Sequence, residues 1–97
     1  MNRVELSAIV CERGALRYTP AGLPALDLQL VHESSQAEAD HAVQVKLNIK
    51  AVAIGTVAER LDKQPVGLNA RFSGFLTNMR QTRQLVLHIQ DFQQNLF

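Results

Sequence analysis

The sequence has no long apolar run and only one cysteine. None of its apolar stretches approaches the ~20 residues that cross a bilayer, and its first ten residues lack the apolar core and small-residue cleavage site of a signal peptide. We therefore expect no association with a membrane. Cys11 has no second cysteine in the chain to pair with, which is typical of the reducing cytoplasm.

An excess of charge of one sign is also missing. Ten lysines and arginines stand against nine aspartates and glutamates, for a formal net charge of +1. Charge alone therefore does not indicate nucleic acid, and such a role has to rest on where the positive side chains lie. The length and ordinary globular composition predict one domain over residues 1–97.

Recognisable patterns of catalysis or metal binding are absent. His32, His41 and His88 have no second ligand at metal spacing, and no glycine-rich phosphate loop is present. Cys11 has no histidine near it in the sequence, so we interpret it as a small buried apolar residue. We expect neither an enzyme nor a bound cofactor or metal.

The dominant pattern is an apolar–polar alternation of period two, which is typical of half-buried strands. The strands that it predicts cover residues 3–10, 25–32, 42–50, 66–76 and 85–92. After Gly55 the period changes, and one helical stripe is formed by Ile54, Val57, Ala58 and Leu61. We expect the third strand to end near Gly55 and a short helix to follow, ending at residues 62–65.

Turn formers and polar residues fill the connections. Residues 11–24 contain two glycines and two prolines and predict a loop or an opened hairpin. Residues 33–40 are polar, acidic and without period, so we interpret them as a flexible connection. Residues 78–84 predict a polar loop with two arginines, and Gly74 indicates a sharp bend or a close backbone approach.

The same alternation assigns side chains to the two faces of each strand. Inward positions in the last two strands are Phe72, Leu85, Leu87 and Ile89. Phe75 and Phe92 are expected to face outward. The outward candidates for a subunit contact are Ile9, Val86 and His88.

Three strands, a short helix and two strands follow one another in the order of the OB fold. That fold is a five-stranded barrel, and its helix lies between strands three and four. We expect an all-β protein of this class, because closure removes the two exposed edges that an open sheet of five strands would have. A mixed sheet with one packed helix is the alternative.

Positive side chains gather in the parts of the chain that OB folds use to bind oligonucleotides. These parts are the face of strands two and three and the loops that join strands one to two and four to five. The residues found there are Arg13, Arg17, Tyr18, Lys46, Asn48, Lys50, Arg80 and Arg83. Because the chain has no tryptophan, Tyr18 is the best stacking candidate, and we expect phosphate contacts to dominate.

Segments along nearly the whole chain resemble the family of primosomal replication protein N, PriB. They match, in order, its NRxxLSGxVC opening, its PSGIP turn, its LEHxSxQxEA stretch, its VxGF strand and its MVLHA strand. In this sequence the matching segments are residues 3–11, 20–24, 30–39, 72–76 and 85–89. Residues 54–59 are similar to the strand-to-helix turn of bacterial single-stranded DNA-binding proteins, the parent group of the family.

The resemblance implies a homodimer of OB folds that binds single-stranded DNA during the restart of stalled replication forks. It implies the PriA helicase as a partner whose unwinding is stimulated, with handover to DnaT in some members. The family's strand-three tryptophan aligns with Lys46 and a nearby phenylalanine with His41, so both positions belong to the implied site. These changes, with a shorter loop around Arg80 and Arg83, move its chemistry toward phosphate contacts.

The leading interpretation is a non-catalytic DNA-binding accessory protein of the primosome that acts with PriA. A second interpretation is a protein-interaction adaptor on PriA with weak nucleic-acid binding, which the near-neutral charge and the missing rings favour. A third is an OB fold for another ligand, such as structured RNA or an oligosaccharide.

Overall fold

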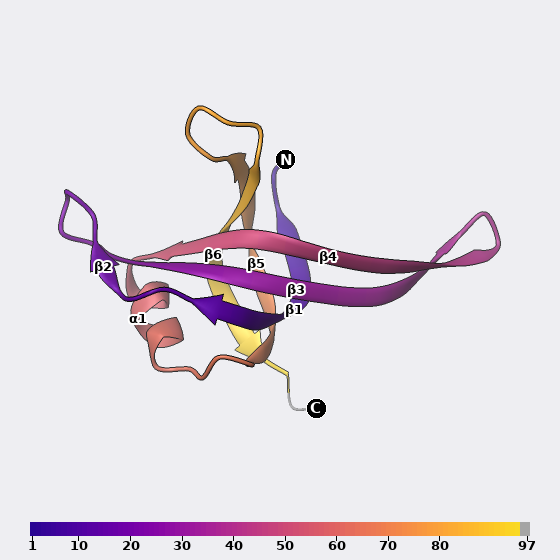
Figure 1. Ribbon diagram of the computed structural model, residues 1–97, viewed down its shortest axis with the longest axis horizontal. Coiled ribbons are helices and arrows are strands. Elements are labelled where there is room, and N and C mark those ends of the chain that lie inside the picture. Colours follow the sequence, from indigo (N-terminus) through magenta and orange to yellow (C-terminus); the bar gives the residue numbers. More distant parts are fainter. Residues whose placement is uncertain (96–97) are drawn as a thin grey trace.

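A β-barrel with one long projecting hairpin forms the protein (Figure 1). The computed structural model describes residues 1–95. The elements are β1 (Val4–Arg13), β2 (Arg17–Tyr18), β3 (Pro24–Glu38), β4 (His41–Ile54), α1 (Thr56–Asp62), β5 (Asn69–Asn78) and β6 (Leu85–Gln94). The strand order is β1-β5-β6-β4-β3-β2, and an additional pairing of β1 with β3 closes the long strands into a barrel.

The expected all-β barrel is confirmed, whereas the place of the helix among the strands was not predicted correctly. A strand of two residues, β2, pairs with Pro24 and Ala25 of β3, so α1 follows the fourth strand instead of the third. Two residues are too few to show a period, so the alternation predicts only a loop or an opened hairpin over this strand. The turn into α1 is as expected: Gly55 adopts φ 94° and its N–H donates to the carbonyl of Pro24.

Apolar side chains from the long strands and the helix fill the barrel. The largest fully buried ones are Phe72, Leu26, Leu30, Leu61 and Leu87. Burying a side chain of this size stabilises the fold by roughly 1.5–3 kcal/mol. The helix contributes Val57, Ala58 and Leu61, three of the four residues of its predicted stripe, and packs against β3, β4 and β6. The fourth, Ile54, is the last residue of β4 and is 42% exposed.

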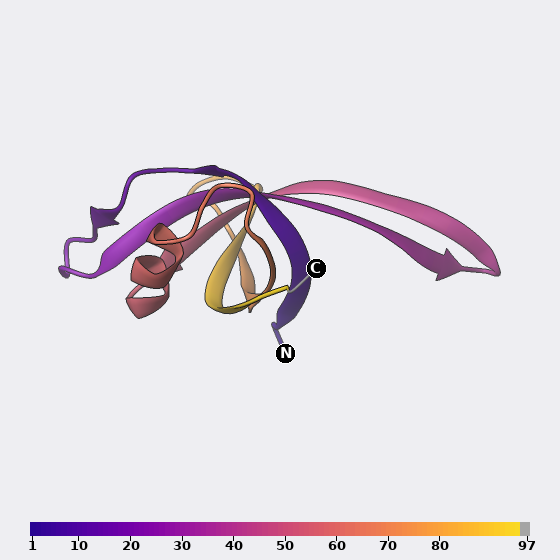
Figure 2. The same cartoon turned by 90° about the horizontal axis from the view of Figure 1, so that it is seen from below.

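β3 and β4 continue beyond the barrel as a hairpin over residues 33–46, which we call the arm (Figures 1 and 2). Its pairing runs without interruption from Glu33↔Lys46 to Glu38↔His41, and the arm gives the molecule its 50 Å long axis. The prediction of a flexible connection over residues 33–40 was therefore wrong. β4 alternates strongly and supplies the edge on which this polar segment pairs.

Two β-bulges account for two errors about individual side chains. One extra residue in β1, Cys11, stands between the pairs Val10↔Leu30 and Glu12↔Gln29. Cys11 is exposed, and its thiol donates to the carbonyl of Gln29, so the expectation of a buried cysteine was wrong.

The second bulge lies in β6. Its register shifts between Ser73 and Gly74 of β5, which pair with Asp91 and Ile89, so Gln90 is the extra residue. Because one inserted residue reverses the alternation, Phe92 turns inward and is only 9% exposed, against the prediction.

Two predictions at the start of β6 were also wrong, whereas the one for Ile9 in β1 was right. Leu85 is the first residue of β6 and is 53% exposed, because the strand begins beyond the core that would cover it. Val86, expected as an outward contact residue, is buried at 8%. Ile9 is outward as predicted, with 44% of its surface exposed.

Candidate nucleic-acid interface

Two adjoining hollows on the outer surface of the barrel form one groove. The larger encloses about 550 Å³ and the smaller about 220 Å³, and both are lined by Asp27 and Lys50. The larger is also lined by Arg17, Ala51, Val52, Ile54, Met79, Val86 and His88. The smaller is also lined by Glu12, Arg13, Gly14, Leu28 and Gln29. The groove therefore joins residues from β1, β2, β3, β4, β6 and the β5–β6 loop.

Arg17 is held at the groove by an ion pair with Asp27. The pairing of β2 with the start of β3 places Arg17 opposite Ala25, two residues from Asp27. Its Nε and Nη2 donate to the two carboxylate oxygens of Asp27 at 3.1 and 3.2 Å. These hydrogen bonds, with the attraction of the carboxylate, raise the pKa of Arg17 above its ordinary value. The two hydrogen bonds orient the guanidinium plane toward Asp27.

Arg13 and Lys50 line the groove in different ways. The guanidinium of Arg13 donates to the carbonyl of Gln64, in the segment after α1, which holds the end of β1 in place. Lys50 faces outward from β4, directly opposite Gln29. None of the four ion pairs among residues 1–95 includes Lys50, so its ammonium is open to an incoming anion.

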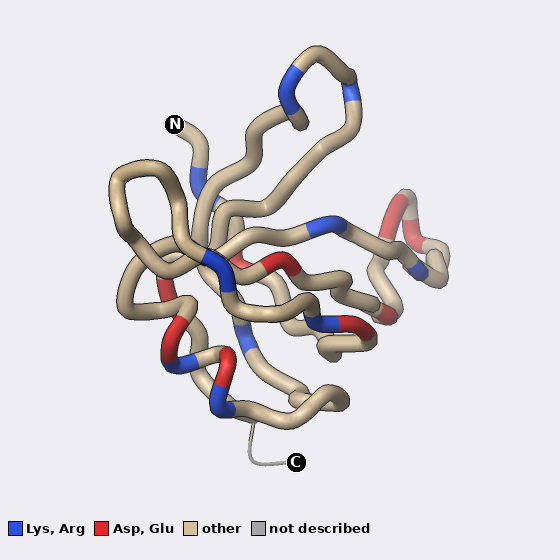
Figure 3. The backbone as a smooth tube through the Cα atoms, turned by 60° about the vertical axis from the view of Figure 1, so that its left-hand side comes forward, with Lys and Arg blue, Asp and Glu red and all other residues tan. Residues whose placement is uncertain are grey.

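Arg80 and Arg83 lie in the β5–β6 loop, whose first residue, Met79, lines the groove. The loop is ordered by its own backbone: Met79 N–H donates to the carbonyl of Gln84 at 2.8 Å, and Thr82 N–H to the carbonyl of Met79 at 3.0 Å. Figure 3 shows the two cationic positions standing on this projecting loop. Both side chains are exposed, so they are accessible to a nucleic-acid strand that would lie in the groove.

Arg80 and Arg83 themselves line neither hollow, and Asn48, Lys46, His41 and Tyr18 lie outside the groove as well. Lys46 is on the arm and forms an ion pair with Glu33 at 3.3 Å. His41 stands at the tip of the arm, opposite Glu38 and next to Asp40, where Figure 3 shows acidic positions. Tyr18 is 67% exposed beside Arg17 but does not line either hollow. The structure thus brings together only part of the predicted set.

Several groove residues were missed in the sequence. Val52, Val86 and Met79 form an apolar floor and wall, and His88 stands beside them. Val52 and Val86 are 9% and 8% exposed, yet they lie outside the main core cluster. In the sequence each of these two valines is an apolar residue at an outward position of its strand, and such a residue is easily interpreted as part of a subunit interface.

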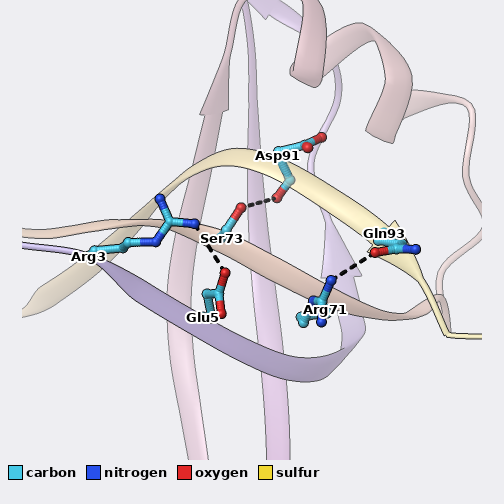
Figure 4. Close-up of polar contacts among 6 residues, drawn as sticks. All are labelled: Arg3, Glu5, Arg71, Ser73, Asp91 and Gln93. Atoms are coloured by element: carbon cyan, nitrogen blue, oxygen red, sulfur yellow. Dashed lines mark hydrogen bonds and ion pairs between the residues drawn. The ribbon is translucent and has the colours of Figure 1, made fainter.

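The outward face of β1, β5 and β6 offers a comparison surface, whose polar contacts Figure 4 shows. It has a hollow of its own of about 180 Å³, lined by Arg3, Glu5, Arg71, Ser73, Asp91, Phe92 and Gln93. Arg3 pairs with Glu5 at 3.1 Å, and Arg71 donates to the side-chain carbonyl of Gln93 at 2.8 Å. Asp91 accepts from Arg60 at 3.0 Å, and this hydrogen bond first of all lowers the pKa of Asp91. On this face Arg3 and Arg60 have carboxylate partners, whereas Arg71 has only the neutral amide of Gln93.

No helix among residues 1–95 is long and apolar enough to span a membrane. No three histidine, cysteine, aspartate or glutamate side chains meet there in a cluster that could hold a metal ion.

Comparisons of the sequence and of the structure with known proteins point to the same family. The sequence model described as "Another single-strand binding protein family" matches residues 2–91. The replication restart protein PriB of Bordetella pertussis is 52% identical over 91 residues, which are 93% of this chain and 85% of that protein. The structure of PriB from Ralstonia solanacearum superposes with a TM-score of 0.89, at 36% identity and 98% coverage of each chain.

A more distant likeness supports the fold alone. The single-stranded DNA binding protein of Thermus aquaticus superposes with a TM-score of 0.77 at 22% identity, over 98% of this chain and 50% of that chain. The PriB proteins of Bordetella pertussis and Ralstonia solanacearum match most of this chain in sequence, and the second also has nearly the same fold. The chain therefore belongs to the PriB family of replication restart proteins, within the wider single-strand-binding group.

Proposed function

We propose that this protein is a non-catalytic accessory protein of the replication-restart primosome that binds single-stranded DNA mainly through phosphate contacts. The observation that carries the proposal is the groove, where Arg13, Arg17 and Lys50 meet under a loop that bears Arg80 and Arg83. Cationic side chains along a groove follow the backbone of a strand and release its counterions, whatever its sequence. Lys46 and His41 would contact only a DNA strand that continues from the groove along the arm.

A homodimer is part of the proposal. Between Val4 and Leu6, β1 pairs with β5 on one side and has no strand partner on the other within residues 1–95. An antiparallel strand edge can pair with the same edge of a second copy about a twofold axis. The apolar side of the arm, with Val43, Val45 and Leu47, continues the core-facing row of β4 past the barrel. A second copy would cover both surfaces.

The curated relatives are replication restart proteins, and on that basis we assign this chain the same process, with the PriA helicase as its partner. Handover to DnaT belongs to some members of the family only. In this role the protein would stimulate unwinding by PriA while it holds the displaced strand. The groove supports the DNA contact. The helicase contact rests on family membership.

An adaptor function on PriA with weak nucleic-acid binding is the second candidate. One observation favours it: of the six cationic candidates, Arg17 and Lys46 already have carboxylate partners. Each pair reduces the charge available to phosphate. A pull-down with PriA, with and without DNA, separates the two functions, because an adaptor binds the helicase equally in both.

Replacement of the unpaired groove cations tests the DNA-binding function. Lys50→Ala, Arg80→Ala and Arg83→Ala should each weaken binding to oligo-dT by roughly fivefold at 0.1 M salt, the loss expected for one phosphate contact on a single strand. The triple variant should lose roughly 100-fold. Fluorescence anisotropy measures these changes.

Arg71→Ala is the matched control, because Arg71 is an exposed arginine on the comparison surface. It should bind as tightly as the unmodified protein. Equal losses in Arg71→Ala and the groove variants would mean that binding depends on net charge alone, and unchanged binding in the triple variant would place the DNA elsewhere.

A further inference from the structure

A row of side chains crosses four neighbouring strands at the groove. The strand pairings place Phe75 of β5 opposite His88 of β6, His88 beside Val52 of β4, and Val52 opposite Asp27 of β3. Side chains opposite one another on paired strands point to the same face. The row therefore runs across the outer surface of the barrel, and three of its four members line the larger hollow.

The first two members of this row form a stack of two rings. The ring centroids of Phe75 and His88 lie 4.8 Å apart, and the two planes differ by only 13°. Phe75 thus covers one face of the imidazole. Both side chains are half-buried, so the orientation of the His88 ring is set by packing.

The next position in the row leaves room beside the imidazole. Val52 is short and 9% exposed, and the groove opens above it with His88 in its lining. Adjacent strands lie about 4.8 Å apart, which is close to the spacing of stacked rings. A flat group over Val52 would therefore continue the stack that Phe75 and His88 begin.

Beyond Val52 the groove is bounded by a second planar group. Asp27 holds the guanidinium of Arg17 through two hydrogen bonds, and both residues line the same hollow. Lys50 is two residues from Val52 on the same face of β4, where its ammonium can reach a phosphate. An apolar floor, a ring on one side and a guanidinium on the other fit a nucleobase with its phosphate at the rim.

We propose that His88 is the base-stacking residue of this protein, and that one nucleobase of the bound strand lies over Val52 against the free face of the imidazole. The inference rests on the proposed binding of single-stranded DNA and assigns it a base contact in addition to the phosphate contacts. Stacking accepts every base, because each base has a π-face. The site therefore distinguishes unpaired from paired nucleotides and is indifferent to sequence.

Abasic DNA separates a base contact from a phosphate contact. Affinities for oligo-dT and for an abasic oligomer of the same length are compared by anisotropy in the full chain and in His88→Ala. His88→Ala should lose roughly 5- to 100-fold on oligo-dT, the range found when a stacking residue is removed. Its affinity for the abasic oligomer and its salt dependence should not change.

Two further variants keep the test independent of folding. His88→Phe retains a flat ring and should keep most of the oligo-dT affinity, whereas His88→Leu retains volume without a flat face and should lose it. Gln93→Ala, at an exposed position of the same strand, is the control and should bind normally. Thermal unfolding establishes that each variant is folded before it is compared.

Three results would overturn the proposal. They are unchanged oligo-dT affinity in His88→Ala, an equal loss on the abasic oligomer, and full affinity in His88→Leu. Failure of the unmodified protein to bind either oligomer would contradict the proposed function itself, so the two failures are distinguishable. In the unmodified protein, the ring protons of His88 should shift upfield in NMR spectra with oligo-dT and stay in place with the abasic oligomer.

Discussion

Gly74 of β5 lies directly against the backbone of β6. A Cβ at this position would stand 1.8 Å from the carbonyl oxygen of His88 and 3.2 Å from the Cα of Ile89. Both neighbours are backbone atoms, so no side chain can turn away to make room. The close approach predicted from Gly74 is therefore confirmed, and it lies directly beneath the residue that we propose to stack on a base.

Gly74→Ala should destabilise the fold by about 1–3 kcal/mol or more, because a buried methyl group would push the two strands apart. Urea unfolding measures the loss. Gly14→Ala is the matched control: its added Cβ would lie 3.6 Å from the nearest atom, the carbonyl oxygen of Asp27, which is an ordinary contact. A Gly74→Ala variant as stable as Gly14→Ala would contradict the packing described here.

At the scale of elements, the apolar–polar alternation predicted the long strands. It did not predict the features that arise when two strands pair, namely the arm and the two β-bulges. Residues 33–40 show no period of their own, and residues 33–38 become part of a strand because β4 lies alongside them. Single extra residues, Cys11 and Gln90, reverse the faces that follow, and a pattern read along one strand cannot show them. The helix was predicted well, because its stripe and Gly55 are local signals.

The arm offers a test of the proposed dimer. Val43 is 37% exposed on the apolar side of the arm, where it contributes nothing to the barrel core. Val43→Asp should shift the protein toward monomer in sedimentation equilibrium without loss of fold, because a buried charge opposes association. The neighbouring Gln44→Asp points to the other side of the arm and should leave the dimer intact. A monomeric unmodified protein, or a dimeric Val43→Asp, would contradict this interface.

At the scale of the whole molecule, placement of charge matters more than its sum. The net charge is only +1, yet Arg13, Arg17 and Lys50 line one groove, where the acidic residues are Glu12 and the Asp27 that pairs with Arg17; Glu38 and Asp40 lie at the tip of the arm. Barrel topology was enough to predict that the first loop, the third long strand and the last loop converge. It could not predict the row from Phe75 to Asp27, because its members come from four strands that only the closed barrel brings together.

The salt dependence of oligo-dT binding tests the central claim most directly, namely that the groove holds a single strand chiefly by its phosphates. The logarithm of the association constant should fall linearly with the logarithm of the salt concentration. For three to five contacts the slope should be about −2 to −3.5, and Lys50→Ala should reduce it by about 0.7. Tight binding that does not change with salt, or a Lys50→Ala slope equal to that of the unmodified protein, would contradict the account.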